Sequence, residues 1–418
     1  MEIEELYSLY IKHYKIDTDT RKIRANSIYF ALKGDNFNGN VFAKEAIKKG
    51  ASYSIVDEKE YVTDDNIILV DNVLTTLQEL AKYHRSQISF PILALTGSNG
   101  KTTSKELLNC VLSKKFRTVA TIGNLNNHIG VPLTILSFDA NTEFGIVEMG
   151  ANHLNEIAFL CDITAPDFGY ITNFGKAHLE GFGGIEGVIK GKSELYQFIK
   201  QNTKKVFVNP RDQKQLDLTK ELDYILFDKG IELVASDPFL EIRFDNIHVR
   251  SNLIGTYNFD NIAFAISIGK YFGVNNDQIR QAIESYVSTN NRSQIIETAQ
   301  NKIVLDAYNA NPTSAEAALK SFSYLKDSNK AVILGDMFEL GKVAAAEHQK
   351  IADLAASFDF NHLFFVGDNF CNIKGDYMTF DSIENLKGYL TKLNIQNTII
   401  LIKGSRGMAL ERLVTTIS

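Results

Sequence analysis

The sequence predicts an α/β protein with three domains, and two observations lead to this fold class. Apolar, strand-like segments alternate with helical patterns along almost the whole chain, which is the order that builds parallel sheets. A length of 418 residues suits roughly two to four domains, and 44% hydrophobic residues with well-mixed charge are ordinary for a globular protein. The rhythm of the segments places the predicted domains at residues 1–88, 89–289 and 290–418.

The first predicted domain has short strands followed by a helix. Its apolar runs lie at 27–34, 52–57 and 66–70, and a helical pattern of apolar positions covers 73–87. Pro91 then marks a break before the first strand of the second domain.

The second and third predicted domains repeat a strand–helix rhythm, which favours a mainly parallel sheet in the second and α/β architecture in the third. The segment 211–250 receives no assignment. The predicted strands lie within 91–97, 144–150, 168–173, 205–210, 302–312, 331–337, 362–368 and 398–407.

Composition excludes several classes of protein. A net charge of −6 gives no basic footprint for nucleic acid. The N-terminus is acidic and lacks the pattern of a signal peptide, and no run of 18 apolar residues exists to span a membrane. Three distant cysteines, without metal-type spacing, suit a reducing compartment. We expect a cytoplasmic protein with neither nucleic acid nor a membrane as partner.

A glycine-containing loop, TGSNGKTT at 96–103, joins a predicted strand to a predicted helix. In that context Gly97 and Gly100 let the backbone approach a phosphate closely, and the helix N-terminus attracts the anion. Lys101 is placed to reach the β- and γ-phosphates of a nucleotide, and the hydroxyl of Thr102 to bind Mg²⁺. The alternative is a simple glycine turn with a solvated lysine. The predicted nucleotide-binding loop comprises Gly97, Ser98, Asn99, Gly100, Lys101, Thr102 and Thr103.

A lysine interrupts the apolar stripe of the helix predicted at 184–200. Apolar residues recur at spacings of three and four, and Lys192 occupies the missing position. One interpretation is that its ammonium reaches past the core to solvent. The other is that burial lowers the pKa of the amine and gives it a function.

Glu148 ends one predicted buried strand, and His178 follows just past the next one. The carboxyl ends of parallel strands meet at one edge of a sheet, so Thr102, Glu148 and His178 are expected to share one crevice. Oxygen and imidazole ligands of this kind suit Mg²⁺ bound together with substrate phosphates. Each residue taken singly is also explained as an ordinary strand-end side chain.

Several motifs, taken in order along the chain, resemble those of the Mur ligases. DAYNANP and LGDMFELG are typical of the members that add D-alanyl-D-alanine, and the family's phosphate loop has the two-residue spacing seen between Gly97 and Gly100. The resemblance covers all three predicted domains. The motifs are TGSNGKTT (96–103), EMGANHLNEI (148–157), ITNFGKAHLEGFGG (171–184), KGKSELY (190–196), GTYNFDNIAFA (255–265), DAYNANP (306–312), LGDMFELG (334–341) and KGSRG (403–407).

The resemblance implies an ATP-dependent amide ligase of cytoplasmic peptidoglycan synthesis. It implies a uridine-nucleotide domain at 1–88, a P-loop ATPase domain at 89–289 and a Rossmann-like ligase domain at 290–418. The implied substrates are ATP, UDP-N-acetylmuramoyl-tripeptide and D-alanyl-D-alanine, joined through an acyl phosphate, and the protein is expected to be a monomer. Two Mg²⁺ ions and a carbamylated Lys192 are the implied cofactors.

The resemblance also assigns roles to single residues. Lys101, His178, Lys192 and Arg292 are the implied catalytic residues, with Arg292 reaching the γ-phosphate. Thr102 and Glu148 would hold one metal ion, and His178 and Lys192 the other. Further nucleotide contacts are implied for Asn258, Asn261 and Asp306. Substrate contacts are implied for Thr20, Arg21, Lys33, Asn124, Asn126, Asn127, His128, Asn309, Asn311, Lys403, Ser405 and Arg406.

Alternatives stay open at this stage. The chain also fits a sister ligase that adds the third peptide residue, a folylpolyglutamate synthase, or a nucleotide-binding regulator that has lost catalysis. Asn311 with Pro312 is also a standard helix start. Asp336 is explained as a turn residue and His348 as a surface residue, and Lys403, Ser405 and Arg406 as a solvated cluster. No motif distinguishes meso-diaminopimelate from lysine as the third peptide residue.

Overall fold

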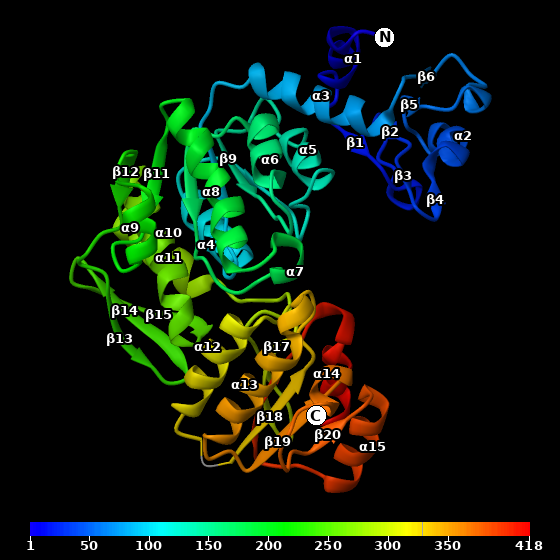
Figure 1. Cartoon of the computed structure of the whole chain (residues 1–418). Coiled ribbons are helices and arrows are strands. Elements are labelled where there is room, and N and C mark those ends of the chain that lie inside the picture. The colour runs from blue at the N-terminus through cyan, green and yellow to red at the C-terminus, as the bar shows by residue number, and fades with distance from the viewer. Residues whose placement is uncertain (328) are drawn as a thin grey trace.

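The computed structural model describes residues 1–327 and 329–418, which form an N-terminal, a central and a C-terminal part (Figure 1). In the N-terminal part four parallel strands pair in the order β1-β2-β5-β6, and β3 pairs with β4. The elements are α1 (Ile3–Tyr10), β1 (Ile16–Asp17), β2 (Ile28–Phe30), β3 (Lys33–Gly34), β4 (Phe37–Asn38), α2 (Ala43–Lys48), β5 (Tyr53–Val56), β6 (Ile67–Leu69) and α3 (Val73–Ser86).

Helix α3 ties the N-terminal part to the central part. The Asn72 side chain caps the helix by accepting from the Thr75 amide. Farther along the helix, the imidazole Nε2 of His84 lies 3.0 Å from the Phe138 carbonyl oxygen of the central part. The hydroxyl of Tyr10 on α1 donates to the Leu136 carbonyl at 2.9 Å. These buried bonds fix α1 and α3 against the segment that follows α5 (Gly130–Ile135).

The central part contains a six-stranded parallel sheet in the order β12-β11-β10-β7-β9-β8. Strand β7 lies between β9 and β10, so the loops after these three strands open at the same edge. The elements up to α8 are β7 (Ile92–Thr96), α4 (Lys101–Leu112), β8 (Thr118–Ala120), α5 (Gly130–Ile135), β9 (Phe144–Glu148), α6 (Glu156–Thr164), β10 (Phe168–Ile171), α7 (Leu179–Phe182) and α8 (Ile185–Gln201).

The unassigned segment 211–250 forms a helix, an edge strand and most of a three-stranded antiparallel sheet, β13-β14-β15. The outer strand of that sheet, β13, is largely exposed, so its residues lack the burial pattern that reveals a strand in a sequence. The elements are β11 (Lys205–Val208), α9 (Gln213–Leu218), β12 (Asp223–Leu226), β13 (Glu232–Ser236), β14 (Phe239–Phe244), β15 (Ile247–Ile254), α10 (Phe259–Tyr271) and α11 (Asn276–Ser285).

The C-terminal part has a second six-stranded sheet in the order β16-β17-β21-β18-β19-β20. Only β16, at one edge, runs antiparallel to its neighbour. The elements are β16 (Gln294–Glu297), β17 (Lys302–Asp306), α12 (Pro312–Ser323), β18 (Lys330–Gly335), α13 (Ala344–Ala356), β19 (His362–Val366), α14 (Asp368–Cys371), β20 (Thr379–Phe380), α15 (Ile383–Leu393) and β21 (Ile399–Lys403).

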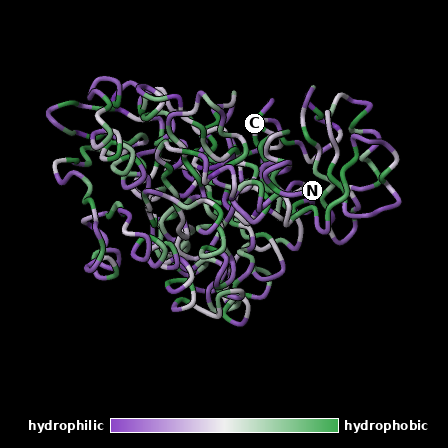
Figure 2. Tube along the Cα trace, turned by 90° about the horizontal axis from the view of Figure 1, so that it is seen from above, coloured by the Kyte–Doolittle hydropathy of each residue, from purple (hydrophilic) through white to green (hydrophobic). Residues whose placement is uncertain are grey.

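The predicted α/β fold class, with a mainly parallel central sheet, is confirmed. Residues 92–95 of β7 are fully buried, as expected for a strand covered on both faces. In Figure 2 hydrophobic stretches run through the inside of the trace, and the outlying loops are mostly hydrophilic. Among the described residues no helix combines the length and the apolar character needed to cross a bilayer.

Candidate active site between the central and C-terminal parts

A cavity of about 590 Å³ lies where the central and C-terminal parts face each other. Its wall is formed by the phosphate loop, the ends of β9 and β17, the start of α10 and neighbouring loops. Most residues that were predicted from distant motifs therefore meet in one place. Predicted residues on the wall are Ser98, Asn99, Gly100, Lys101, Thr102, Thr103, Asn124, Asn126, Asn127, His128, Glu148, His178, Asn258, Asn261, Arg292, Asp306, Asn309 and Lys403.

The phosphate loop has the conformation that its two glycines permit. Gly97 has φ of +139°, and a Cβ there would lie 2.0 Å from Thr172 Oγ1. Gly100 has φ of +81°, and a Cβ there would lie 2.5 Å from Asn261 Oδ1. Any larger residue at either position would be strained and would also displace a neighbour. Helix α4 begins directly after Gly100, so its first amides face the cavity.

The ammonium group of Lys101 folds back on the loop, where it donates to the Gly97 carbonyl at 2.6 Å. Burial lowers the pKa of Lys101 to about 8, and the positive charge of Arg292 acts in the same direction, while Glu148 opposes the shift. An anion that binds beside this enclosed amine therefore stabilises its protonated form.

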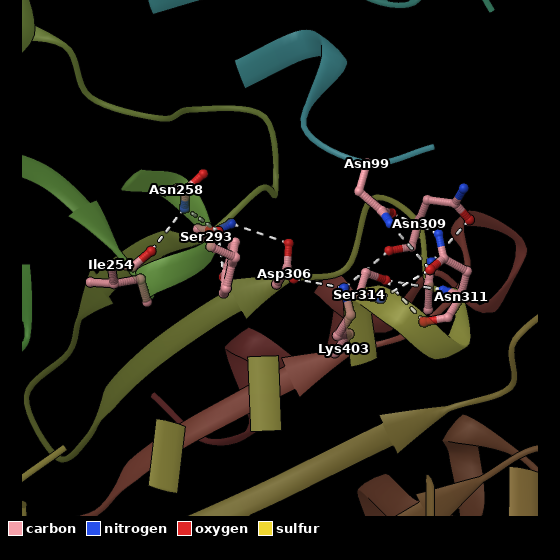
Figure 3. Close-up of polar contacts among 11 residues, drawn as sticks. Asn99, Ile254, Asn258, Ser293, Asp306, Asn309, Asn311, Ser314 and Lys403 are labelled. Carbon is pink, nitrogen blue, oxygen red and sulfur yellow. Dashed lines mark hydrogen bonds and ion pairs between the residues drawn. The ribbon is translucent and has the colours of Figure 1, made fainter. Parts of the chain in front are cut away.

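Two asparagines connect the start of α10 to the phosphate-loop helix. Asn261 Oδ1 accepts from the Ser104 hydroxyl at 2.9 Å, and its amide donates to Asn258 Oδ1 at 2.8 Å. Asn258 in turn donates to the Ile254 carbonyl at 2.8 Å (Figure 3). The two residues thus lock the position of the loop, and they also lie on the cavity wall.

Glu148 and Thr102 form a pair suited to a divalent cation. The Thr102 hydroxyl donates to Glu148 Oε1 at 3.2 Å, and the Asn126 amide donates to the same oxygen at 2.8 Å. Glu148 Oε2 is buried and has no hydrogen-bond partner among the described residues. The ammonium of buried Lys105 lies 3.9 Å from this oxygen. A hydroxyl and a carboxylate with an oxygen that no hydrogen bond uses fit Mg²⁺, which keeps few protein ligands and takes the rest from phosphates and water. The described residues contain no group of three His, Cys, Asp or Glu that could hold a metal ion.

Lys192 is fully buried on α8, so the interpretation that it reaches solvent is wrong. Its amine donates to the Ala151 carbonyl at 3.0 Å and lies 5.1 Å from the centre of the Phe182 ring. Burial lowers its pKa well below the ordinary value, and the nearby charge of Lys101 adds to the effect. Ala151 lines the cavity while Lys192 itself lies just behind the wall.

His178 faces the C-terminal part. Its Nδ1 contacts the carboxylate of Glu339, which lies in the LGDMFELG segment, and this contact lowers the pKa of Glu339. His178 has a left-handed backbone with φ of +53°, an uncommon state for a non-glycine residue. The histidine predicted as a metal ligand is therefore paired with an acidic residue that the sequence had not singled out.

Asp306 ends β17 and is held from two sides. Lys403 donates to its Oδ2 at 2.7 Å, and the Ser293 amide donates to its Oδ1 at 3.3 Å (Figure 3). Since Lys403 is buried and paired with this carboxylate, it supports Asp306 and is not a free cation. The interpretation of Lys403 as part of a solvated cluster is wrong.

A second cavity of about 180 Å³ adjoins His178. Ser405 is buried and its hydroxyl accepts from the Phe338 amide at 2.9 Å, whereas Arg406 is exposed at the mouth. Predicted residues lining this cavity are His178, Asn309, Asn311, Ser405 and Arg406.

Three predicted substrate residues, Thr20, Arg21 and Lys33, lie in the N-terminal part and line neither cavity. Arg21 pairs with Asp19, and Lys33 lies 3.0 Å from the carboxylate of Asp57.

Asn311 caps α12 with a capping box and Pro312 follows in the first turn, so the helix-start interpretation is confirmed. Asp336 does more than form a turn, because it accepts from the amides of Asn369 and Phe370. His348 is fully buried and its Nε2 accepts from the Met337 amide at 2.9 Å, so the surface interpretation is wrong.

Sequence reasoning missed Asn173, Tyr257 and Tyr308, which also line the larger cavity. Asn173 lies just beyond β10, so the strand-end rule that selected Glu148 would have found it. The two tyrosines carry no comparable signal, because aromatic residues are common in cores.

Models of known protein families match all three parts of the chain. Residues 12–92 match the model "Mur ligase family, catalytic domain", residues 95–269 "Mur ligase middle domain", and residues 291–406 "Mur ligase, glutamate ligase domain". A UDP-N-acetylmuramoyl-tripeptide–D-alanyl-D-alanine ligase of Bacillus subtilis is 30% identical over 96% of this chain and 92% of its own. The chain belongs to the Mur ligase family.

Three further proteins resemble this Mur ligase over nearly the whole chain. The ligase of the same name from Escherichia coli is 30% identical over 96% of this chain and 92% of its own. A crystal structure of MurF from Acinetobacter baumannii matches with a TM-score of 0.85 at 29% identity, over 96% of this chain and 93% of that one. MurF from Thermotoga maritima in complex with ADP matches with a TM-score of 0.84 at 26% identity, over 96% of each chain.

A folylpolyglutamate synthase of Mycobacterium tuberculosis shares the fold alone, at 14% identity and a TM-score of 0.63 over 82% of this chain.

Proposed function

We propose that this Mur ligase uses ATP to join D-alanyl-D-alanine to UDP-N-acetylmuramoyl-tripeptide in the synthesis of peptidoglycan precursors. Relatives with this activity in their names match nearly the whole chain. The observation that carries the proposal is the single cavity in which the phosphate loop, the Thr102–Glu148 pair and Arg292 meet.

The reaction requires that the negative charge of the two reactants be neutralised, and it uses no protein nucleophile. The terminal carboxylate of the tripeptide takes the γ-phosphoryl group of ATP, which gives an acyl phosphate and ADP. The amine of the dipeptide then attacks the acyl carbon, and the collapsing intermediate expels phosphate. Two anions must approach each other in the first step, so Lys101 and Arg292 contribute by stabilising the transferred phosphoryl group.

Mg²⁺ belongs to this proposal because the buried pair of Thr102 and Glu148 fits it. Thr102 and Glu148 would hold one ion, and His178 with Lys192 would hold a second. The bound ions would neutralise phosphate charge. For the second site the neutral amine of Lys192 would add CO₂ and release a proton, giving a carbamate anion. Full burial with a lowered pKa is what such an amine requires.

The remaining substrate roles follow the predicted positions. Asn124, Asn126, Asn127 and His128 line the larger cavity on the side of the central part and would contact the muramoyl peptide. Thr20, Arg21 and Lys33 would contribute to the uridine-nucleotide site. Ser405 and Arg406, at the smaller cavity, would hold the carboxylate of the dipeptide. The predicted domain boundaries, monomeric state and cytoplasmic location belong to the same proposal.

The test is ligation by the purified protein with ATP, Mg²⁺, D-alanyl-D-alanine and a UDP-muramoyl tripeptide, followed by mass spectrometry. Parallel reactions with a meso-diaminopimelate and a lysine tripeptide identify the third residue. We expect a product equal to both substrates minus water, with one ADP per product. Glutamate with a folate acceptor is the control. Absence of product from both tripeptides, or ligation of the folate instead, would refute the proposal.

A further inference from the structure

Tyr308 lines the larger cavity next to Asn309, which lines both cavities, and two arginines lie over its ring. The guanidinium carbon of Arg292 is 3.7 Å from the centre of the Tyr308 ring, and that of Arg406 is 5.6 Å from it. Arg292 lines the larger cavity and Arg406 the smaller one. One aromatic ring therefore contacts a cation from each site.

The turn that carries Arg292 is unusual and depends on its surroundings. Its neighbours Asn291 and Ser293 have left-handed backbones, with φ of +57° and +50°. Such conformations persist where surrounding contacts hold them. Here the Tyr308 amide donates to the Asn291 carbonyl at 3.2 Å, which ties the turn to the residue that stacks on Arg292.

The Arg292 side chain has little else to hold it. Its Nε is buried and lacks a hydrogen-bond partner within residues 1–327 and 329–418. A planar guanidinium stacks well on an aromatic face, and the negative face of the ring stabilises the cation. Stacking also leaves the N–H groups of the arginine free for an anionic ligand. The ring thus orients the cation without using its donors.

We propose that Tyr308 is a positioning residue that sets both guanidinium groups, so that the phosphate end and the dipeptide end of the reaction are aligned through one side chain. This inference rests on the proposed function for the two ligands, but the placement of the arginines can be measured without it. The alternatives are that the Tyr308 hydroxyl has its own role, or that the ring only fills space.

The experiment replaces Tyr308 with phenylalanine and then with its mono-, di- and trifluorinated forms. Fluorine withdraws electron density from the ring face while the shape changes little, so it weakens cation–π contacts and leaves packing almost intact. We expect the phenylalanine variant to retain activity within about twofold. Along the series kcat should fall and KM for D-alanyl-D-alanine should rise together, each by about two- to thirtyfold in total.

Two internal controls accompany the series. KM for the UDP-muramoyl tripeptide should stay constant, because neither arginine is assigned to that substrate. The same substitutions at Tyr324, which is 75% exposed at the end of α12, should change neither parameter. A flat series at Tyr308 would overturn the inference, as would a change in kcat without a change in KM for the dipeptide.

A second measurement needs no turnover. An aromatic ring shifts the NMR signals of groups above its face, so the side-chain signals of Arg292 and Arg406 should be displaced upfield in the free protein. Both displacements should disappear in Tyr308→Leu. If they do so while no ligation occurs, the proposed function fails, and the placement of both arginines over the ring stands. Displacements that persist in Tyr308→Leu would contradict the positioning role itself.

Discussion

The side-chain amine of Lys192 is buried in surroundings that disfavour its protonated form. The proposed carbamate would give this buried amine a function. We predict that Lys192→Ala lowers kcat by roughly a hundred- to a thousandfold, the loss seen when a charge-stabilising group is removed. Acetate or propionate should restore part of the activity, because a small carboxylate can replace the missing anion. Depleting CO₂ should slow the wild-type enzyme, and bicarbonate should reverse this.

Lys190 offers a matched control on the same helix, since it is exposed two residues away. Lys190→Ala should turn over like the wild type. Wild-type turnover by Lys192→Ala would rule out the carbamate.

Lys101 gives a prediction about pH, because its pKa is lowered to about 8 in the free protein. Nucleotide phosphates favour the charged amine, so binding above this pKa must take up a proton. Affinity for ATP should be nearly constant below about pH 7, about twofold weaker at pH 8, and should then fall by roughly tenfold per pH unit well above the pKa. Titration calorimetry across this range measures the slope.

In Lys101→Arg the guanidinium stays charged, so the fall in ATP affinity above pH 8 should disappear, whatever the absolute affinity of the variant. An unchanged slope in that variant would show that another group titrates.

Among single residues, the sequence identified those whose neighbours form a motif. Thr102 and Glu148 were found because a loop and a strand end define their positions. Glu339 and Tyr308 lie inside recognised motifs but were not singled out, because their importance arises from contacts with His178 and Arg292, which lie outside those motifs. Such contacts depend on tertiary placement, which local spacing does not encode.

At the scale of elements, helix α3 carries a buried titratable residue, His84. Burial lowers the pKa of His84 to about 4, although its bond to Phe138 acts in the opposite direction. An unfolded histidine has a pKa near 6.5. Between about pH 6.5 and 4 the unfolded chain therefore binds a proton that the folded chain does not. The free energy of unfolding should decrease as pH falls through this window, and this contribution should be lost fully below about pH 4.

His84→Gln, which does not titrate, should flatten the pH dependence in urea unfolding over this range. Exposed His13, replaced in the same way, should leave the slope as in the wild type. An equal slope in His84→Gln and the wild type would contradict the buried, neutral imidazole.

Element prediction succeeded where burial leaves a pattern. The apolar run of β7 and the three- and four-residue spacing of α8 both appear at the expected positions. It failed over β13, whose residues face solvent. The antiparallel direction of β16 was also beyond reach, because it is set by pairing with β17 rather than by residues within the strand.

At the scale of the whole molecule, contacts between the central and C-terminal parts surround the active site. The Asn311 amide donates to Asn99 Oδ1 of the phosphate loop at 2.7 Å (Figure 3), and Lys176 pairs with Glu347 at 2.6 Å. The C-terminal part therefore touches the loop that would hold ATP. Closure of this kind also excludes water from an acyl phosphate.

Arg292 reaches the cavity from the C-terminal side, so its contribution should appear in the closed, reacting complex. We predict that Arg292→Ala lowers kcat by roughly a hundredfold or more while the dissociation constant of ATP rises only a few-fold. Single-turnover kinetics and direct ATP binding separate the two effects. Arg243→Ala, at an exposed position of β14, is the control. Equal losses in kcat and ATP affinity would argue against a role that depends on closure.

The central claim is that ATP activates the tripeptide carboxylate as an acyl phosphate, and oxygen transfer tests it most directly. The terminal carboxylate is labelled with ¹⁸O at both oxygens, and the released phosphate is analysed by mass spectrometry after ligation with D-alanyl-D-alanine. The account predicts one ¹⁸O in each phosphate and the other in the new amide carbonyl. Phosphate without label, formed together with the ligated product, would contradict it.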